Sequence, residues 1–152
     1  MATKHEIDEF LAQKTLASVG VSRSGKKFGN AILKDLTKLG YRLLPVHPEA
    51  AEVGGVQAYR SFAALPEPVG GVIVVVPPAQ AEHVVKDAAA NGIRRVWLQQ
   101  GAESPAAIKF CGENGMSVVH GECVLMYPKP TTSWIHGAHR WIWELIGRAP
   151  TR

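Results

Sequence analysis

Glycines and basic residues are closely spaced between positions 18 and 36, where the sequence reads SVGVSRSGKKFGNAILKDL. From Gly20 the spacing is Gly-x-Ser-x-x-Gly, with Gly29 next, before a helical pattern. A glycine-rich turn between a strand and a helix directs backbone N–H groups and the positive end of the helix dipole at an anion. Three cations of the turn, Arg23, Lys26 and Lys27, would add to that attraction. The turn predicts a phosphate site; the alternative is a plain tight turn before a helix.

Two common phosphate sites do not fit these residues. A Walker A loop needs Ser or Thr after its Gly-Lys pair, and this chain has Lys27 there. A classical NAD site needs an acidic residue at the end of the second strand, to bind the ribose hydroxyls. Here that strand ends in His47 and Pro48, and Glu49 follows the proline. NAD binding is therefore disfavoured.

Catalytic and metal-ligating patterns are weaker than the glycine-rich turn. No His-Glu-x-x-His or paired-cysteine spacing occurs, so no metal is expected, and His136 and His139 are predicted to be packing or surface residues of a helix. We find no plausible Ser–His–Asp arrangement, and the carboxylates are scattered. His120 follows a strand near the expected cleft. Whether the protein is an enzyme stays open, and a binding module is favoured over a catalyst.

Short β-rich runs alternate with helical patterns along the chain. Strands are expected at residues 16–21, 41–46, 72–76, 95–98 and 116–119. Helices are expected before Gly40, before Asn91, and from Ser104 to Asn114; Ser61 is expected to cap a short helical turn. This alternation predicts an α/β fold: a single Rossmann-like domain whose five-stranded, mostly parallel sheet has helices on both faces. Its carboxyl edge would position the glycine-rich turn.

Size and composition fit one globular domain. The chain has 152 residues, 46% of them hydrophobic, a net charge of +4 and no long basic run. These values favour a small anionic ligand over nucleic acid. Only two cysteines are present, and no apolar stretch is long enough to span a bilayer, so we expect a cytoplasmic protein that does not bind membranes. Cys111, beside Phe110, is expected to be a packing residue.

A further helix is predicted at residues 134–147, after the last strand. It carries three of the four tryptophans of the chain, Trp134, Trp141 and Trp143. The helix could pack back on its own sheet. A homodimer contact through this C-terminal helix is the alternative, because the aromatic residues exceed what one packed face needs.

Four motifs together resemble a known family. They are the Gly-x-Ser turn, Pro-Val-x-Pro after the second strand (PVHP), Val-Pro-Pro after the third (VVPP) and Leu-Gln-Gln-Gly after the fourth (LQQG). In combination they resemble the small CoA-binding domain proteins, similar to the N-terminal domain of the succinyl-CoA synthetase α subunit. The resemblance covers roughly residues 16–128. It implies a core of about residues 14–128 with a helical extension at 129–152.

The resemblance implies a site for CoA at the carboxyl ends of the strands. Gly20, Ser22 and Arg23 would hold the CoA phosphates, with Lys26 or Lys27 near those of the adenosine. The remaining contacts would line the adenosine (Val46, His47, Pro48), border the nucleotide and the pantetheine arm (Val76, Pro77, Pro78) and follow that arm (Gln99, Gln100, Gly101). The chain departs from the family at His47, where Asn is usual, and at Glu49, where a basic residue is common.

Cys123 stands where the family often has a cysteine, close to where the CoA thiol could arrive. A mixed disulfide or acyl transfer is chemically feasible there, although a free cysteine is more often an inert apolar residue. The favoured function is a module that binds CoA or acyl-CoA as ligand or regulator. A small Rossmann oxidoreductase or other NAD(P)-binding protein is the alternative, and a structural or regulatory partner with a vestigial pocket is a third reading.

Overall fold

A five-stranded parallel sheet forms the centre of the protein. The computed structural model describes residues 3–20 and 28–127. The strands are β1 (Thr15–Val19), β2 (Arg42–Val46), β5 (Gly71–Val74), β6 (Arg95–Gln99) and β7 (Ser117–Glu122), in the order β2-β1-β5-β6-β7. All adjacent pairs in this sheet are parallel. The Rossmann-like α/β fold expected from the sequence is confirmed.

Helices connect the strands at the points that the sequence predicts. They are α2 (Phe28–Lys38), α3 (Pro78–Ala90) and α4 (Pro105–Glu113). Ser104 caps α4, because its Oγ accepts a hydrogen bond from the backbone N–H of Ala107 at 3.0 Å. Asn91 ends α3 and Asn114 ends α4. The predicted end of α3 and the predicted start and end of α4 are thus confirmed.

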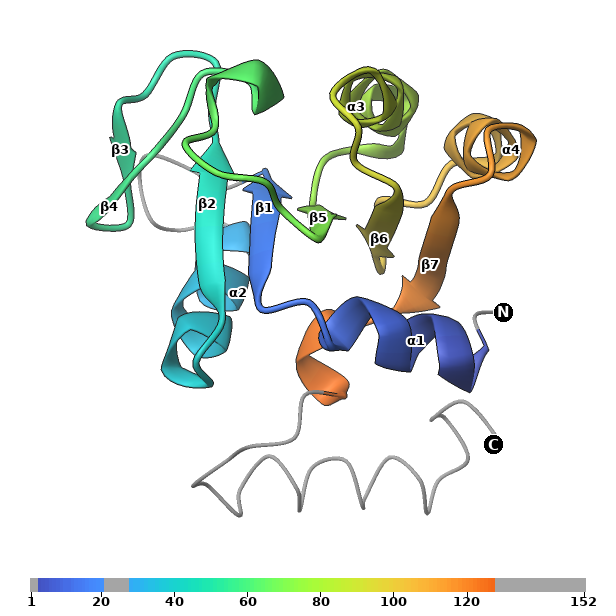
Figure 1. The fold of residues 1–152 in the computed structure, drawn as a ribbon, viewed down its shortest axis with the longest axis horizontal. Coiled ribbons are helices and arrows are strands. Elements are labelled where there is room, and N and C mark those ends of the chain that lie inside the picture. The colour runs from blue at the N-terminus through green and yellow to red at the C-terminus, as the bar shows by residue number, and fades with distance from the viewer. Residues whose placement is uncertain (1–2, 21–27, 128–152) are drawn as a thin grey trace.

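The sheet is buried between two layers of helices (Figure 1). On one face, α2 and the N-terminal helix α1 (Lys4–Leu11) pack in a cluster that includes Leu16 and Trp97 of the sheet. On the other face, α3 and α4 pack in a cluster with Ala17, Val72 and Val96. Burial on both faces explains why the strands read as continuous apolar runs rather than alternating ones.

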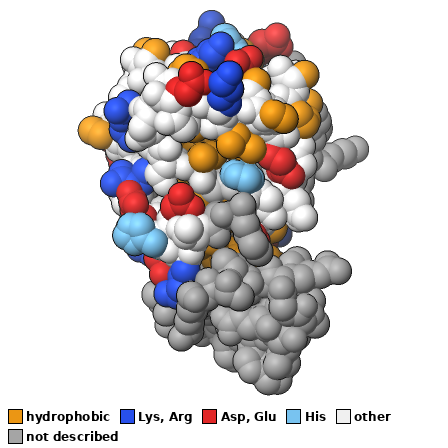
Figure 2. Space-filling view, turned by 90° about the vertical axis from the view of Figure 1, so that its right-hand side faces the viewer, with side chains coloured by type: hydrophobic (Ala, Val, Ile, Leu, Met, Phe, Trp, Pro, Cys, Tyr) orange, Lys and Arg blue, Asp and Glu red, His pale blue; other side chains and the backbone are white. Residues whose placement is uncertain are grey.

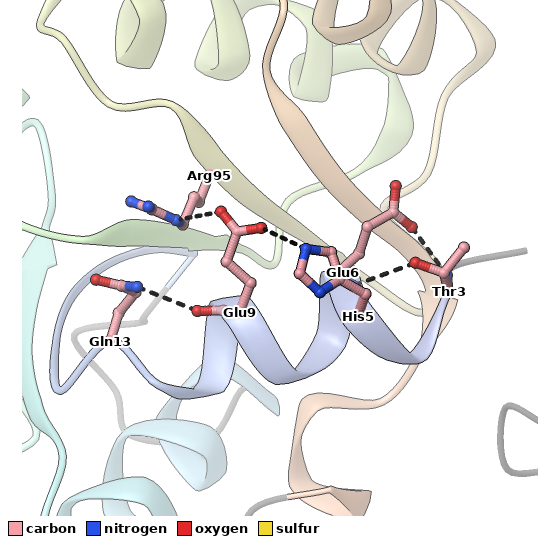
Figure 3. A network of polar contacts seen from close by, with 6 residues as sticks. All are labelled: Thr3, His5, Glu6, Glu9, Gln13 and Arg95. Carbon is pink, nitrogen blue, oxygen red and sulfur yellow. Dashed lines mark hydrogen bonds and ion pairs between the residues drawn. The ribbon is translucent and has the colours of Figure 1, made fainter. Parts of the chain in front are cut away.

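Helix α1 was not expected from the sequence. Thr3 and Glu6 form a capping box at its start, with hydrogen bonds of 2.8 and 3.2 Å. Its Phe10 is buried and lies 5.4 Å from Trp97 between ring centroids. Figure 3 shows the polar contacts along the helix, where Arg95 at the start of β6 donates to Glu9 at 2.9 Å. The helix is therefore packed into the core and tied to the amino edge of the sheet.

Three further details differ from the expectations. The irregular region after β2 contains a short antiparallel pair, β3 (Glu52–Val53) and β4 (Val56–Gln57). The short helical turn is a 3-10 helix at Phe62–Ala64; Ser61 precedes it but makes no side-chain capping bond, so that part of the prediction was wrong. Strand β7 continues to Glu122 through an irregularity in its pairing with β6, next to Gly121, whose φ is +77°. Such a bulge re-aims the residues that follow it.

The molecular surface beside α4 and β7 carries mixed charges. On this side, Lys and Arg side chains are interspersed with Asp and Glu, and apolar side chains form small groups (Figure 2). Interspersed charges of both signs produce a weaker field than a patch of one sign.

Among the described helices, none is long and apolar enough to cross a membrane.

Candidate functional site

The carboxyl ends of the parallel strands gather most of the predicted site residues at one edge of the sheet. The strand order reverses between β1 and β5, because β2 lies on one side of β1 and the chain then crosses to place β5, β6 and β7 on the other side. Open α/β sheets bind ligands outside the carboxyl ends of their strands at such a switch point. The segments after β1, β2, β5 and β6 all lie at this edge.

Gly20, directly after β1, lies in contact with the segment after β5. The Val75 N–H donates to the Val19 carbonyl at 2.8 Å, so the two strands stay paired up to the switch point. Gly20 has a φ of +114°, and a Cβ on it would stand 2.2 Å from the Val75 carbonyl oxygen. Only glycine fits both the conformation and the space. The first glycine of the predicted phosphate turn thus has a steric requirement that the structure shows directly.

His47 organises the exit from β2. Its Nδ1 accepts hydrogen bonds from the backbone N–H groups of Glu49, at 3.0 Å, and Ala50, at 2.9 Å. An asparagine side-chain oxygen makes the same kind of local bond to backbone N–H groups. An asparagine, the residue that is usual here in the resembled family, could accept the same two hydrogen bonds. Val46 beside it is buried, and Pro48 is exposed.

Residues after β5 lead directly into helix α3. Val76 is partly buried and packs on the apolar cluster beneath α3, whereas Pro77 and Pro78 are exposed. Pro78 is the first residue of α3, a position where the missing proline N–H costs nothing. The two prolines thus form a stiff, apolar border next to Gly20 and Val75.

Gln99, the last residue of β6, is 1% exposed and fully engaged within the protein. Its Oε1 accepts from the Val124 N–H at 3.0 Å, and its Nε2 donates to the Cys123 Sγ at 3.1 Å. The side chain therefore joins the ends of β6 and β7. Gln100 and Gly101, which follow, are exposed, and a Cβ added at Gly101 would meet no atom within 4 Å.

The two cysteines occupy different environments. Cys111 is fully buried on α4, and burial raises the pKa of its thiol to about 11. Its predicted role in packing is confirmed. Cys123 is half-buried after β7, at the same edge as the other site residues, with its sulfur held by Gln99. Neither cysteine is in a disulfide.

Several predicted residues lie outside the described part of the chain. They are Ser22, Arg23, Lys26 and Lys27 of the phosphate turn, His136 and His139, and the tryptophans of the expected C-terminal helix. Within residues 3–20 and 28–127, no group of three His, Cys, Asp or Glu side chains is placed to hold a metal ion.

The predicted phosphate turn starts at Gly20, at the switch point of the sheet. Gly20 lies against the backbone of Val75 there, and helix α2 begins at Phe28. The sequence profile of the family described as CoA binding domain matches residues 14–128. The chain belongs to the CoA-binding domain family. The match extends over three-quarters of the chain, in agreement with the resemblance drawn from the four motifs.

Curated relatives of this CoA-binding domain fall into two kinds. YneT of Bacillus subtilis, an uncharacterised protein, is 28% identical over 123 residues, covering 80% of this chain and 91% of YneT. The α subunit of ADP-forming acetate–CoA ligase II of Pyrococcus furiosus is 26% identical over 129 residues. That match covers 78% of this chain but only 28% of the subunit. The chain thus spans nearly all of YneT and little more than a quarter of the ligase subunit.

Solved structures show the same domain. A conserved hypothetical protein of Pyrococcus furiosus is 39% identical with a TM-score of 0.69, covering 73% of this chain and 96% of its own. Relatives of about the length of this domain therefore exist beside the much longer ligase subunit.

Proposed function

We propose that the protein binds CoA or an acyl-CoA at the carboxyl edge of the sheet, as a binding or regulatory module. The observation that carries the proposal is the contact between Gly20, the first residue of the predicted phosphate turn, and Val75 at the switch point. Membership of the CoA-binding domain family and the ligase relative support CoA as the nucleotide.

In this proposal each segment meets one part of the ligand. Gly20, Ser22 and Arg23 hold the phosphates, with Lys26 or Lys27 close by. The β2 exit at Val46, His47 and Pro48 takes the adenosine, and the border at Val76, Pro77 and Pro78 guides the start of the pantetheine arm. Gln100 and Gly101 lie along that arm, while Gln99 holds the loop that carries Cys123.

The thiol of Cys123 would allow thiol–disulfide exchange at the proposed site. Its thiolate would attack one sulfur of CoA disulfide, forming a protein–CoA mixed disulfide and releasing one CoA thiolate. Intact-mass spectrometry after incubation with CoA disulfide should show one CoA adduct, absent from Cys123→Ser. An adduct that persists in that variant, or none in the wild type, would remove this option.

Thermal unfolding with a panel of nucleotides tests the proposed function. A ligand at 100 times its Kd stabilises the native state by about 2.7 kcal/mol, which raises the melting temperature measurably. We expect CoA to raise it, and NAD(H), NADP(H) and FAD to leave it unchanged. A shift with a nicotinamide cofactor alone would favour the oxidoreductase alternative instead, and no shift with any nucleotide would favour a vestigial pocket.

A cytoplasmic location and a homodimer through the C-terminal helix stay proposals from the sequence. The helix expected at residues 134–147 is outside the described residues. Sedimentation of the wild type and Trp141→Ala tests the dimer. A dimer that dissociates in the variant supports it, and a monomeric mass for both proteins removes it.

A further inference from the structure

A short extended segment prolongs the sheet beside the end of β2. The Tyr59 N–H donates to the Pro45 carbonyl at 2.9 Å, and the His47 N–H donates to the Tyr59 carbonyl at 2.8 Å. Tyr59 and Val46 form a parallel bridge. Because the two segments run in the same direction, Arg60 comes level with His47, just beyond the carboxyl end of β2.

Among the described residues, Arg60 is the cation that lies at the carboxyl edge of the sheet. Elsewhere among the described residues, each lysine and arginine is near the amino end of a strand or within a helix: Lys4, Lys14, Lys34, Lys38, Arg42, Lys86, Arg94, Arg95 and Lys109. Arg60 is exposed and has no ion-pair partner among the described residues. By contrast, Arg42 pairs with Glu67 at 3.1 Å and Arg95 with Glu9 at 2.9 Å.

A cation beside the end of the second strand has a known chemical use in this class of fold. The ribose of a bound dinucleotide lies there, where an acidic residue selects a free ribose hydroxyl and a nearby arginine accommodates a ribose phosphate. This chain has Arg60 level with His47 at that place. The arrangement therefore suits an adenosine with a phosphomonoester on its ribose.

We infer that Arg60 binds the 3′-phosphate of CoA and so makes the site select CoA over dephospho-CoA. The inference rests on the proposed function, and adds a specificity residue that the four motifs do not contain. The guanidinium presents several N–H donors to the phosphate oxygens, a strong charge-assisted contact. The 2′-phosphate of NADP has the same chemistry, so the test includes it.

Calorimetric titrations of three proteins with CoA, dephospho-CoA, NADP and NAD isolate this contact. The proteins are the wild type, Arg60→Gln and Arg94→Gln. Arg94 is a matched control, because it is an exposed arginine at the amino end of β6, at the opposite edge of the sheet. Both variants lose one positive charge, so long-range attraction of an anion falls alike. Thermal unfolding without ligand checks that both variants fold.

We expect the wild type to bind CoA about tenfold or more tightly than dephospho-CoA, the size of a good charged contact. In Arg60→Gln the ratio of the two affinities should fall close to one, with little change in the affinity for dephospho-CoA, whereas Arg94→Gln should keep the wild-type ratio.

An unchanged ratio in Arg60→Gln, or equal affinities of the wild type for CoA and dephospho-CoA, would overturn the inference while the proposed function stands. NADP bound in preference to NAD, and more tightly than CoA, would assign Arg60 to that cofactor. No binding of either CoA form would remove both proposals.

Discussion

The Cα of Gly20 faces the carbonyl group of Val75 so closely that a Cβ at position 20 would stand 2.2 Å from the Val75 oxygen. The contact joins the ends of two adjacent parallel strands, β1 and β5, at the switch point of the sheet. It fixes where the chain leaves β1, and hence where the phosphate turn begins.

Replacing Gly20 by alanine should destabilise the fold strongly. The substitution forces a side chain into a left-handed conformation and into contact with backbone, which cannot rotate away. We expect a loss of about 2–4 kcal/mol in the free energy of unfolding, measured by urea denaturation. Gly92→Ala is the matched control, since its φ is +79° but nothing lies within 4 Å of the new Cβ. Equal losses of unfolding free energy in the two variants would show that the contact with Val75 adds nothing to the destabilisation.

Asparagine should replace His47 with little effect, whereas leucine should not. The Oδ1 of asparagine can accept the N–H groups of Glu49 and Ala50, which leucine would leave without this partner. We expect His47→Leu to lose about 1 kcal/mol of stability and His47→Asn less than half of that. Amide hydrogen exchange at Ala50 should be faster in His47→Leu alone. Equal exchange in the two variants would contradict the capping role.

Gln99 should be needed for the loop after β7, although its side chain is turned away from solvent. Gln99→Leu leaves the Val124 N–H without its partner in the interior, which costs about 1–3 kcal/mol. Gln100→Leu, at the exposed neighbouring position, should change the free energy of unfolding by less than about 0.5 kcal/mol. Urea denaturation compares the two. A Gln99→Leu protein as stable as the wild type would show that these bonds contribute little.

The buried thiol of Cys111 should make the protein less stable at alkaline pH. A cysteine thiol that is not buried has a pKa of 9.0, and burial raises the pKa of Cys111 to about 11. Between pH 9 and pH 11 the unfolded chain has therefore released a proton that the native state retains. Stability therefore falls as pH rises from 9 to 11, by on the order of 2 kcal/mol. Burial also raises the pKa of Tyr41, with the same sign.

Comparison with Cys111→Ala separates the two groups. Denaturation at pH 8, 9 and 10 should show a shallower fall in the variant than in the wild type, because Tyr41 titrates in both. At neutral pH a thiol reagent should modify Cys123 in the native wild type and leave Cys111 unmodified until urea is added. Parallel pH profiles for the two proteins would contradict this assignment.

The sheet and the helices that connect its strands were predictable from local patterns. Continuous apolar runs indicate strands buried on both faces, and capping residues such as Ser104 and Asn114 mark helix ends. The four motifs also led to the correct family. These signals depend on residues that are close together in the sequence, so they can be recognised without knowledge of the tertiary contacts.

What the sequence did not predict depends on contacts between distant residues. Helix α1 is short and charged, and its place in the fold rests on Phe10 packing against Trp97. The burial of Gln99 follows from its bonds to Cys123 and Val124, about 25 positions away. Arg60 comes beside His47 only because the chain after β4 returns along β2. Pairings of this kind leave no periodic pattern to read.

Titration of the isotopically labelled protein with CoA, followed by amide NMR, tests the location of the site most directly. We expect the largest shifts at Gly20, His47, Val76 and Gly101, at the carboxyl edge of the sheet. The amides of Val69 and Gly92, at the opposite edge, should stay unchanged. Absence of shifts, or shifts confined to the amino edge, would contradict a CoA site at the switch point between β1 and β5.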